Sequence, residues 1–318
     1  MKKYIFLASA VVALAACSSN EEFEQIGNCE IKLNSTLLVQ TRAAQGIQST
    51  EFDSGAKIAV FINENSESPS VDYPQPLEYE VGGGGSLTTT NPQYFPQNSN
   101  GVTIYAVYPL EAGKNVTVTE QAAEFAVQSD QSTDDNYKAS DLMVGSPTTD
   151  DKVVYRTTDE VTLQFKHCLS KININIKVGD GVDANDLDGA RVTIYTKTND
   201  ATFDVQSGVI TAVGSQGQAA SPFVTVGDLT ASGNGFEGMS AIIIPQDISA
   251  GSHFISIATN NQTTYRYNLP NTVNLISFEP GKAYTYNLTV RKSGLTLDNT
   301  NITDWDDGGS VDGDAFQS

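Results

Sequence analysis

Apolar and polar residues alternate along most of this chain, which is the pattern of β-strands with one buried face. The clearest example spans residues 171–178, where Ile172, Ile174, Ile176 and Val178 would share one face. The same alternation predicts strands at residues 30–40, 57–63, 101–109, 153–156, 161–168, 191–197, 201–205, 223–226, 241–244, 253–259, 263–269 and 283–290. Clusters of Gly, Asn, Asp and Pro separate these segments, as turns require.

Helical periodicity is weak throughout the sequence. No window of about 12 residues repeats its apolar positions with the helical period, and residues 121–128 are the one short helical candidate. Many short strands at spacings of about ten residues favour antiparallel β-sandwiches, and 318 residues are enough for two domains. The turn-rich segment 138–159 predicts a boundary near residue 157, and the glycine run at residues 82–85 indicates a flexible loop.

The N-terminal residues have the layout of an export signal. Two lysines precede an apolar stretch at residues 4–16, which is shorter than the roughly 20 residues needed to span a bilayer. The stretch runs into Leu14-Ala15-Ala16-Cys17, which resembles a lipobox and so implies cleavage before Cys17 and attachment of lipid to that cysteine. An ordinary signal cut, with Cys17 a free thiol, is the alternative.

The charge balance limits the partners that the protein can have. The sequence holds 18 Lys and Arg against 38 Asp and Glu, a formal net charge of −20. Loss of a signal peptide with two lysines gives −20 − 2 = −22. Such a field repels phosphate backbones, so we expect no nucleic-acid partner.

Few residues suit catalysis or metal binding. Two His and three Cys are little material for a zinc site or a histidine-based catalytic centre, so we predict no catalytic residues, no metal site, no cofactor and no enzymatic activity. The acidic segment 304–314 lacks the closing Glu of a calcium loop, which favours a solvated terminus. Cys29 and Cys168 could pair in an oxidising compartment. Two isolated cysteines are more often unpaired, and the sequence leaves this open.

Seven short motifs follow the lipobox in order along the chain. They are TRA (residues 41–43), FDSGAKIAVF (52–61), TIYAVYP (103–109), DLM (141–143), FKHCLSKI (165–172), PGKAYTY (280–286) and ITDW (302–305). Together they resemble the fimbrillin family, the Mfa-like branch of type V pilus proteins. Two positions depart from the family pattern, because Ala56 stands where an acidic residue is commoner and Cys168 where Ala is commoner. Both are structural positions.

The resemblance implies an all-β fold with two tandem antiparallel β-sandwich (transthyretin-like) domains after a lipoprotein signal. Residues 1–16 are then the signal peptide and residues 17–42 an acidic tether with a removable N-terminal strand. Residues 43–157 form the N-terminal sandwich, and residues 158–318 form the C-terminal sandwich with a candidate donor strand near 294–305.

The resemblance also implies assembly by strand exchange. In such pilins a lipoprotein precursor at the outer membrane carries an N-terminal strand that completes its first domain. An Arg-specific surface protease then cuts the chain, here between Arg42 and Ala43, and a strand from a neighbouring subunit fills the groove. The implied partners are other pilus subunits, that protease, the outer membrane through the lipid on Cys17, and a host or bacterial surface ligand.

The residues before Arg42 suit a removable strand. Residues 30–40 alternate, and the apolar anchors of one face are Ile31, Leu33, Leu37 and Val39. A groove that loses such a strand exposes apolar surface and an unpaired edge, which must find another strand. The alternative for Arg42 is an ordinary solvated surface residue.

Residues 294–305 are the candidate donor strand. Their apolar anchors are Leu295, Leu297, Ile302 and Trp305. The alternation breaks at residues 299–301, and either a β-bulge or a strand in two parts would reconcile this. The alternative is a last strand packed within its own domain, and the sequence leaves both open.

We therefore predict a structural and adhesive fimbrial subunit at the cell surface, processed after Arg42 and polymerised by strand exchange. The rival prediction is an unprocessed surface lipoprotein, either a pilus anchor or a module that binds glycans or host proteins. Exposed aromatic residues would support the rival, and the loosely clustered candidates are Tyr73, Tyr79, Tyr94 and Phe95. The sequence does not separate shaft, tip and anchor roles.

Overall fold

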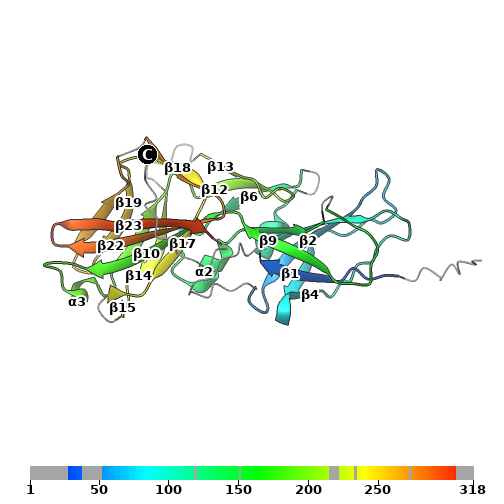
Figure 1. Cartoon of the computed structure of the whole chain (residues 1–318), viewed down its shortest axis with the longest axis horizontal. Coiled ribbons are helices and arrows are strands. Elements are labelled where there is room, and N and C mark those ends of the chain that lie inside the picture. Colours follow the sequence, from blue (N-terminus) through cyan, green and yellow to red (C-terminus); the bar gives the residue numbers. More distant parts are fainter. Residues whose placement is uncertain are drawn as a thin grey trace, which may run out of the picture.

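The computed structural model describes residues 28–37, 52–117, 120–149, 152–214, 222–232, 235–271 and 274–305. The described chain is mainly β and elongated, with two β-rich halves arranged end to end (Figure 1). Cys17, Val39, Arg42 and Ala43 lie outside the described residues. Among the helices of the described part, none is long and apolar enough to cross a bilayer.

One eight-stranded sheet forms the first half. Its strands are β1 (Leu33–Leu37), β2 (Lys57–Glu64), β3 (Leu77–Val81), β4 (Ser86–Thr88), β5 (Val102–Tyr108), β7 (Met143–Pro147), β8 (Val153–Val154) and β9 (Val161–His167). They lie in the order β2-β3-β4-β1-β9-β7-β5-β8, and β2 also pairs with β5. The strands from β2 to β5 in this order therefore close into a ring.

Strand β2 is buried on both faces, which explains its unbroken apolar sequence. Ile58 and Val60 belong to the core inside the ring. Ala59 and Phe61 point the other way, into a second core that also holds Leu110 from the short helix α1 (Leu110–Lys114) and most buried residues of the second half. This shared outer face joins the two halves of the molecule.

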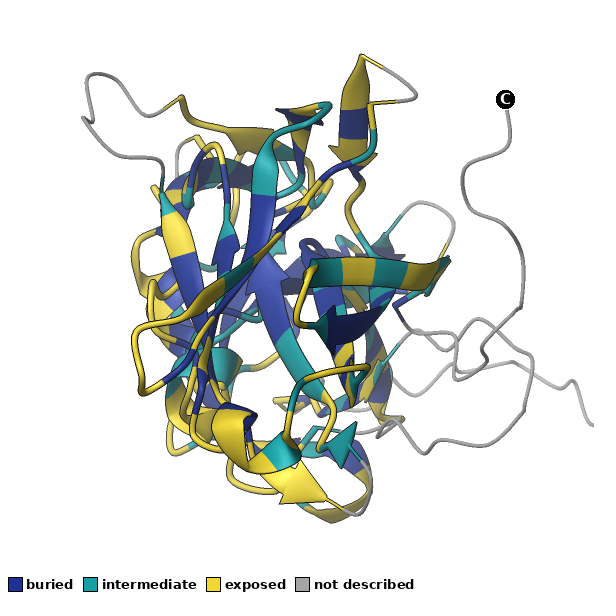
Figure 2. Cartoon of the chain, turned by 90° about the vertical axis from the view of Figure 1, so that its left-hand side faces the viewer, coloured by how far each residue is buried: buried dark blue, intermediate teal, exposed yellow. Residues whose placement is uncertain are grey.

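Several smaller sheets build the second half. Their strands are β10 (Ser170–Val178), β11 (Arg191–Tyr195), β12 (Asp200–Asp204), β13 (Ile210–Ala212), β14 (Phe223–Asp228), β15 (Ala231–Ser232), β16 (Gly235–Phe236), β17 (Met239–Ile243), β18 (Gln246–Ser249), β19 (His253–Ala258), β20 (Thr264–Asn268), β21 (Leu275–Phe278), β22 (Lys282–Arg291) and β23 (Gly294–Asp304). One sheet has the order β15-β16-β10-β22-β23, with β17 also on β10, and another has the order β14-β11-β19-β20. Two short helices, α2 (Asp134–Ala139) and α3 (Ala184–Leu187), lie in connections. Viewed along the molecule, the central strands are buried along their middles, whereas many turns and the edge strand β23 are exposed or half-buried (Figure 2).

The segment expected to be helical is a strand. β6 (Ala122–Ala126) pairs antiparallel with β12, in a small sheet that also contains β13. Its Ala123 and Phe125 are buried, while Glu124 between them is exposed. The tertiary partner decides the conformation of this short apolar stretch, so a prediction from the local sequence alone was wrong.

The sheets are mixed rather than purely antiparallel. β1 runs parallel to β9, and β10 runs parallel to β22. β9 belongs to the first sheet although it lies beyond the boundary expected near residue 157. Only two residues separate β9 from β10, so the chain passes from one half to the other directly after His167.

Cys29 and Cys168 are both buried. Cys29 packs in the core of the ring, whereas Cys168 packs in the second core. The structure therefore contains no disulfide between them.

The carboxylate of Glu64, at the end of β2, joins two loops of the first half. It accepts hydrogen bonds from the backbone amides of Ser70 (2.6 Å) and Val71 (3.0 Å) and from the Ser70 hydroxyl (2.9 Å). It also accepts from the side-chain amides of Asn98 (2.7 Å) and Asn100 (2.9 Å). The bonds from Asn100 and Asn98, followed by the others, lower the pKa of Glu64 to about 2.

This network predicts a pH dependence of stability. Because the folded pKa of about 2 lies below the ordinary value of 4.5, Glu64 stabilises the fold fully above pH 4.5 and loses that contribution as the pH falls towards 2. Glu64→Gln is expected to lower the melting temperature at pH 7 and to flatten its decline between pH 4.5 and 2. Melting curves across this range test the expectation, with the exposed Glu67→Gln as the control. Parallel curves for Glu64→Gln and the native chain would contradict it.

Candidate functional site

Strand β1 lies in a slot between β9 and β4 (Figure 1). Its pairing with β9 is parallel and covers all five residues of β1, from Leu33 opposite Val161 to Leu37 opposite Phe165. On the other side it pairs antiparallel with β4, with Leu33 opposite Leu87. β1 is therefore an interior strand of the ring, paired along its whole length with β9 and at Leu33 and Asn34 with β4.

The residues just before β1 are also held by the first half. The Phe95 amide donates to the carbonyl of Cys29 (2.9 Å), and the Ile31 amide donates to the carbonyl of Gln93 (2.8 Å). The Cys29 thiol donates to the Thr157 carbonyl (3.1 Å). Backbone hydrogen bonding to the first half thus begins before β1 itself, at Cys29.

One face of this segment is deeply buried. Ile31, Leu33 and Ser35 are each 2% exposed, and Leu37 is partly buried against the same core. The residues between them carry polar side chains, and Lys32 and Thr36 are exposed. Ile31, Leu33 and Leu37 thus lie on one face of the segment, whereas Val39 lies outside the described residues; that this strand is removable stays a prediction.

A glycine turn contacts β1 from the side of β4 and accepts hydrogen bonds from it. It is the short 3₁₀ helix η1 (Gly83–Gly85), in which Gly84 and Gly85 have φ of 67° and 78°. The Ser35 hydroxyl donates to the Gly85 carbonyl (2.9 Å), and the Asn34 side-chain amide donates to the Gly84 carbonyl (3.3 Å). A Cβ on Gly85 would lie 2.2 Å from the Ser35 carbonyl oxygen, which is too short for a contact between non-bonded carbon and oxygen atoms. Only glycine therefore fits beside β1 at this position.

Sequence reasoning took this glycine run for a flexible loop. The run stands immediately before β4, and four successive glycines beside a short strand are a known signal for close approach of another backbone. That signal was present but did not say which strand approaches.

The candidate donor strand β23 lies at the edge of its sheet, next to β22 (Figure 1). It pairs antiparallel with β22 along its whole length. Leu295 and Leu297 are only partly buried, and Ile302 is 36% exposed. Of the four anchor residues, Trp305 alone is fully buried, at 3% exposure.

A one-residue bulge divides β23. Asn299 pairs with Asn287 and Leu297 with the next residue, Leu288, so Asp298 is the extra residue. Its carboxylate accepts a hydrogen bond from the Thr289 hydroxyl (2.6 Å). The bulge immediately precedes the residues where the alternation breaks, and it lets Thr300 and Ile302 lie opposite the buried Tyr286 and Tyr284.

Trp305 fixes the end of β23 at the junction of the two halves. Its ring stacks on that of His167, the last residue of β9, with centroids 4.1 Å apart and an angle of 3° between the planes. His167 Nδ1 lies 2.7 Å from a carboxylate oxygen of Asp141. The Trp305 amide donates to the Gly281 carbonyl (2.7 Å). The end of the candidate donor strand thus contacts the end of the strand that lines the slot.

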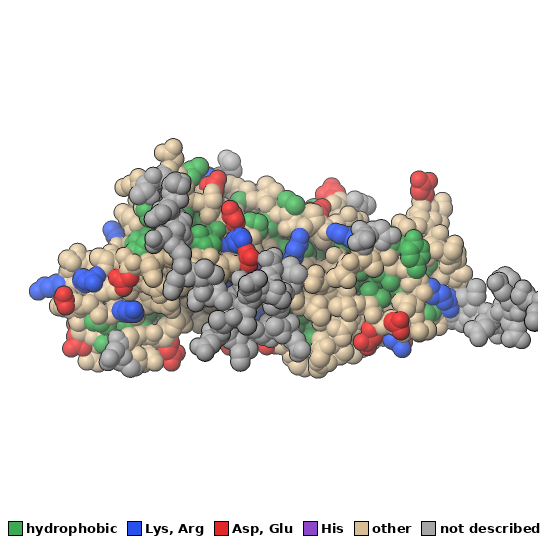
Figure 3. Space-filling model, viewed as in Figure 1, with side chains coloured by type: hydrophobic (Ala, Val, Ile, Leu, Met, Phe, Trp, Pro, Cys, Tyr) green, Lys and Arg blue, Asp and Glu red, His purple; other side chains and the backbone are tan. Residues whose placement is uncertain are grey.

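The aromatic residues proposed for a binding surface are mostly core residues. Tyr73, Tyr79 and Phe95 are buried in the ring, and only Tyr94 is exposed. The Tyr73 hydroxyl donates to the Tyr94 carbonyl (2.7 Å). The aromatic cluster that would have favoured a glycan-binding module is therefore absent from the described surface. On the face seen in Figure 3, hydrophobic side chains form small separate patches between polar residues.

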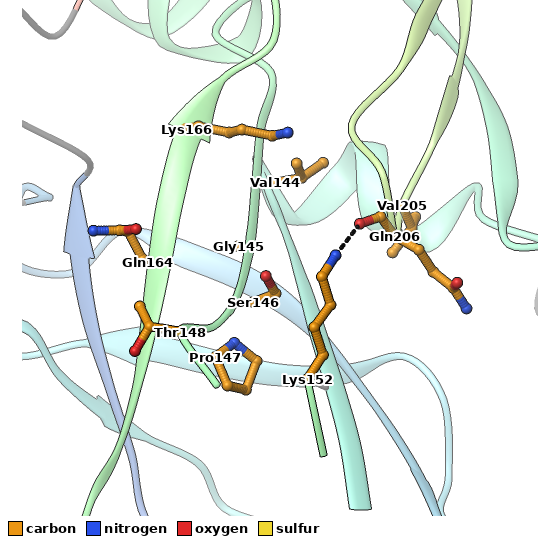
Figure 4. Close-up of a pocket in the computed structure, with 10 residues that line it drawn as sticks. All are labelled: Val144, Gly145, Ser146, Pro147, Thr148, Lys152, Gln164, Lys166, Val205 and Gln206. Carbon is orange, nitrogen blue, oxygen red and sulfur yellow. Dashed lines mark hydrogen bonds between the residues drawn. The ribbon is translucent and has the colours of Figure 1, made fainter. Parts of the chain in front are cut away.

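A cavity of about 140 Å³ lies where the turn after β12 meets β7 and β9 (Figure 4). Two lysines line it. The Lys152 ammonium donates to the Gln206 carbonyl (3.2 Å), and the Lys166 ammonium donates to the Ser207 carbonyl (2.9 Å). These bonds connect the first sheet to the second half. Within the described residues, no group of three or more His, Cys, Asp or Glu side chains could hold a metal ion.

Comparisons with known proteins agree with this architecture. The fimbrillin-like family (Mfa_like_1) matches residues 41–305, and a prokaryotic membrane lipoprotein lipid attachment site matches residues 1–18, which contain Cys17. A search of curated proteins finds no match.

Two crystal structures of proposed cell adhesion proteins share the fold. The one from Bacteroides ovatus has a TM-score of 0.65 at 22% identity and covers 87% of this chain and 98% of its own. The one from Bacteroides uniformis has a TM-score of 0.62 at 20% identity, with the same coverage. Because the family match spans most of the sequence, this chain is a lipoprotein that belongs to the fimbrillin-like family of structural, non-enzymatic fimbrial proteins.

Proposed function

We propose that this protein is a fimbrial subunit that polymerises when β1 leaves its slot and a strand of a neighbouring subunit replaces it. The observation that carries the proposal is the position of β1. It is an interior strand of the first sheet, yet it belongs to the N-terminal segment just before Arg42. A cut there would separate an interior strand from the rest of its own domain.

Loss of β1 would leave a surface that needs a new partner. Burial of Ile31 and Leu33 contributes roughly 3–6 kcal/mol, at about 1.5–3 kcal/mol each, and the bonds to β9 and β4 add to this. An empty slot would expose Leu163 and Phe165, which are now fully buried, and the unpaired edges of β9 and β4. Such edges recruit an extended segment.

Processing after Arg42 would act on the anchor and the strand together. The lipid on Cys17 and strand β1 belong to the same piece, residues 17–42. A single cut by an Arg-specific surface protease would therefore release the subunit from the outer membrane. The same cut would leave β1 without a covalent link to its domain, so that it could leave the slot. The mature chain would begin at Ala43.

Strand β23 is the candidate donor. It is an edge strand with one hydrogen-bonded neighbour, and its side chains are mostly half-buried or exposed. Its detachment would therefore disturb less of its own core than the loss of an interior strand.

The test is limited proteolysis of the purified precursor with an Arg-specific protease, followed by denaturing electrophoresis of unheated samples and electron microscopy. The proposal predicts a ladder of oligomers and filaments only after cleavage. A cleaved chain that stays monomeric at high concentration would contradict it and would favour the pilus anchor or stationary surface lipoprotein.

A further inference from the structure

Segments of β1 and β23 share a pattern of residue types, although only two of seven aligned residues are identical. Residues 31–37 read IKLNSTL, and residues 295–301 read LTLDNTN. When Leu295 is aligned with Ile31, both segments carry two large aliphatic residues two positions apart, then Asn or Asp, then a small polar residue, then Thr. The two strands lie in different halves of the molecule, pair with different neighbours and pack against different cores.

The slot provides a different environment for the side chain at each of these positions. It buries Ile31 and Leu33 completely, and Leu295 and Leu297 have the same volume class. At the next inward position the Ser35 hydroxyl donates to the Gly85 carbonyl, and the side-chain amide of Asn299, which is one bond longer, also offers a hydrogen-bond donor. Leu37 is only partly buried, so a polar Asn301 costs little there.

In its own sheet, β23 does not bury the residues of this pattern as β1 does in the slot. There Leu295 and Leu297 stay partly exposed, and the bulge at Asp298 turns Thr300 inward instead of Asn299. In the slot of β1 the segment would run without a bulge, because β1 has none in its pairing with β9. Residues 295, 297, 299 and 301 would then all face the core.

From these observations we propose a register for the exchanged strand, an inference that rests on the proposed function. Residues 295–301 of a second copy of this chain enter the slot parallel to β9, with Leu295 in the place of Ile31 and Leu297 in that of Leu33. Thr300 takes the place of Thr36 and lies opposite Gln164, because Thr36 pairs with Gln164 in β9. The glycine turn η1 fixes this register through the residue in the place of Ser35.

Paired cysteines test the register in the polymer. The variant Gln164→Cys with Thr300→Cys is processed with an Arg-specific protease, allowed to assemble and analysed without reductant. Directly opposite residues are within the disulfide range, whereas a shift of two residues adds about 6.6 Å along the strand and takes the Cα atoms beyond about 7 Å. The matched control is Thr162→Cys with Thr300→Cys, which probes that shift. Both β9 positions face outward and are at least partly exposed.

We expect covalent oligomers with Gln164→Cys and at least about fivefold fewer with Thr162→Cys, given the narrow geometry of a disulfide. Polymers that form but cross-link through Thr162→Cys, or through neither position, would overturn the register and leave strand exchange standing. Chains that form no polymer after cleavage would overturn strand exchange and the register with it.

A synthetic peptide of residues 293–303 tests the same register without requiring β23 to detach. Labelled peptide should displace the β1 fragment from the cleaved protein and, with cysteine at position 300, cross-link to Gln164→Cys. In the slot, Asp298 takes the place of Asn34, whose amide donates to the Gly84 carbonyl. Asp298→Asn in the peptide should therefore tighten binding by about threefold to tenfold, the effect of one hydrogen bond. Asp298→Ala is the control, and equal affinities for the Asn and Ala peptides would contradict the register.

Discussion

Replacing Arg42 by alanine is expected to stop assembly while leaving the fold intact. The variant keeps β1 covalently attached, and spontaneous opening of the slot must then overcome the roughly 3–6 kcal/mol that Ile31 and Leu33 contribute. Since each 1.4 kcal/mol is a factor of ten, the oligomer yield should fall by about a hundredfold or more. Electrophoresis of unheated samples after treatment with an Arg-specific protease measures the yield.

Arg156→Ala is the matched control, because Arg156 is an exposed arginine of the first half that lies outside the proposed processing segment. This variant should assemble like the native chain. Filaments from Arg42→Ala in normal yield would show that removal of β1 by a cut at this position is not the step that permits assembly.

Replacing Gly85 by alanine is expected to loosen β1 more than any other single change in the turn. Alanine at the φ of 78° is strained by about 1–2 kcal/mol. Its Cβ would also meet the Ser35 carbonyl oxygen at 2.2 Å, so that β1 must shift. Overpacking of this kind typically costs a further 1–3 kcal/mol or so. The expected loss of unfolding free energy is about 2–5 kcal/mol, measured by urea denaturation of the precursor.

Gly84→Ala separates the two causes. Gly84 has a similar φ of 67°, but an added Cβ would meet nothing within 4 Å. It should therefore show the strain alone, and hydrogen exchange of the β1 amides should accelerate for Gly85→Ala but hardly for Gly84→Ala. Equal losses in the two variants would mean that the turn does not hold β1.

Most strands follow from alternation because one face meets a core and the other meets water. β10 and β22 are examples, and both lie within a residue of the predicted bounds. β3 and β4 were missed, although β3 alternates cleanly in its burial. The alternating polar residues Glu78 and Glu80 and the glycines that follow make this stretch resemble a loop.

Pairing partners could not be derived from the sequence. The parallel alignment of β1 with β9 joins residues more than a hundred positions apart, and no local pattern encodes it. The anchors Ile31 and Leu33 were predictable, because they are apolar residues at alternate positions. The role of Gly85 was not, because it depends on which backbone passes beside it.

The most direct test of the account is mass spectrometry of subunits recovered from assembled fimbriae at the cell surface. If β1 is exchanged during assembly, the mature chains begin at Ala43 and carry neither lipid nor residues 17–42. Assembled subunits that retain an acylated Cys17 and an uncut bond after Arg42 would contradict the central claim, because β1 would still belong to every subunit in the polymer.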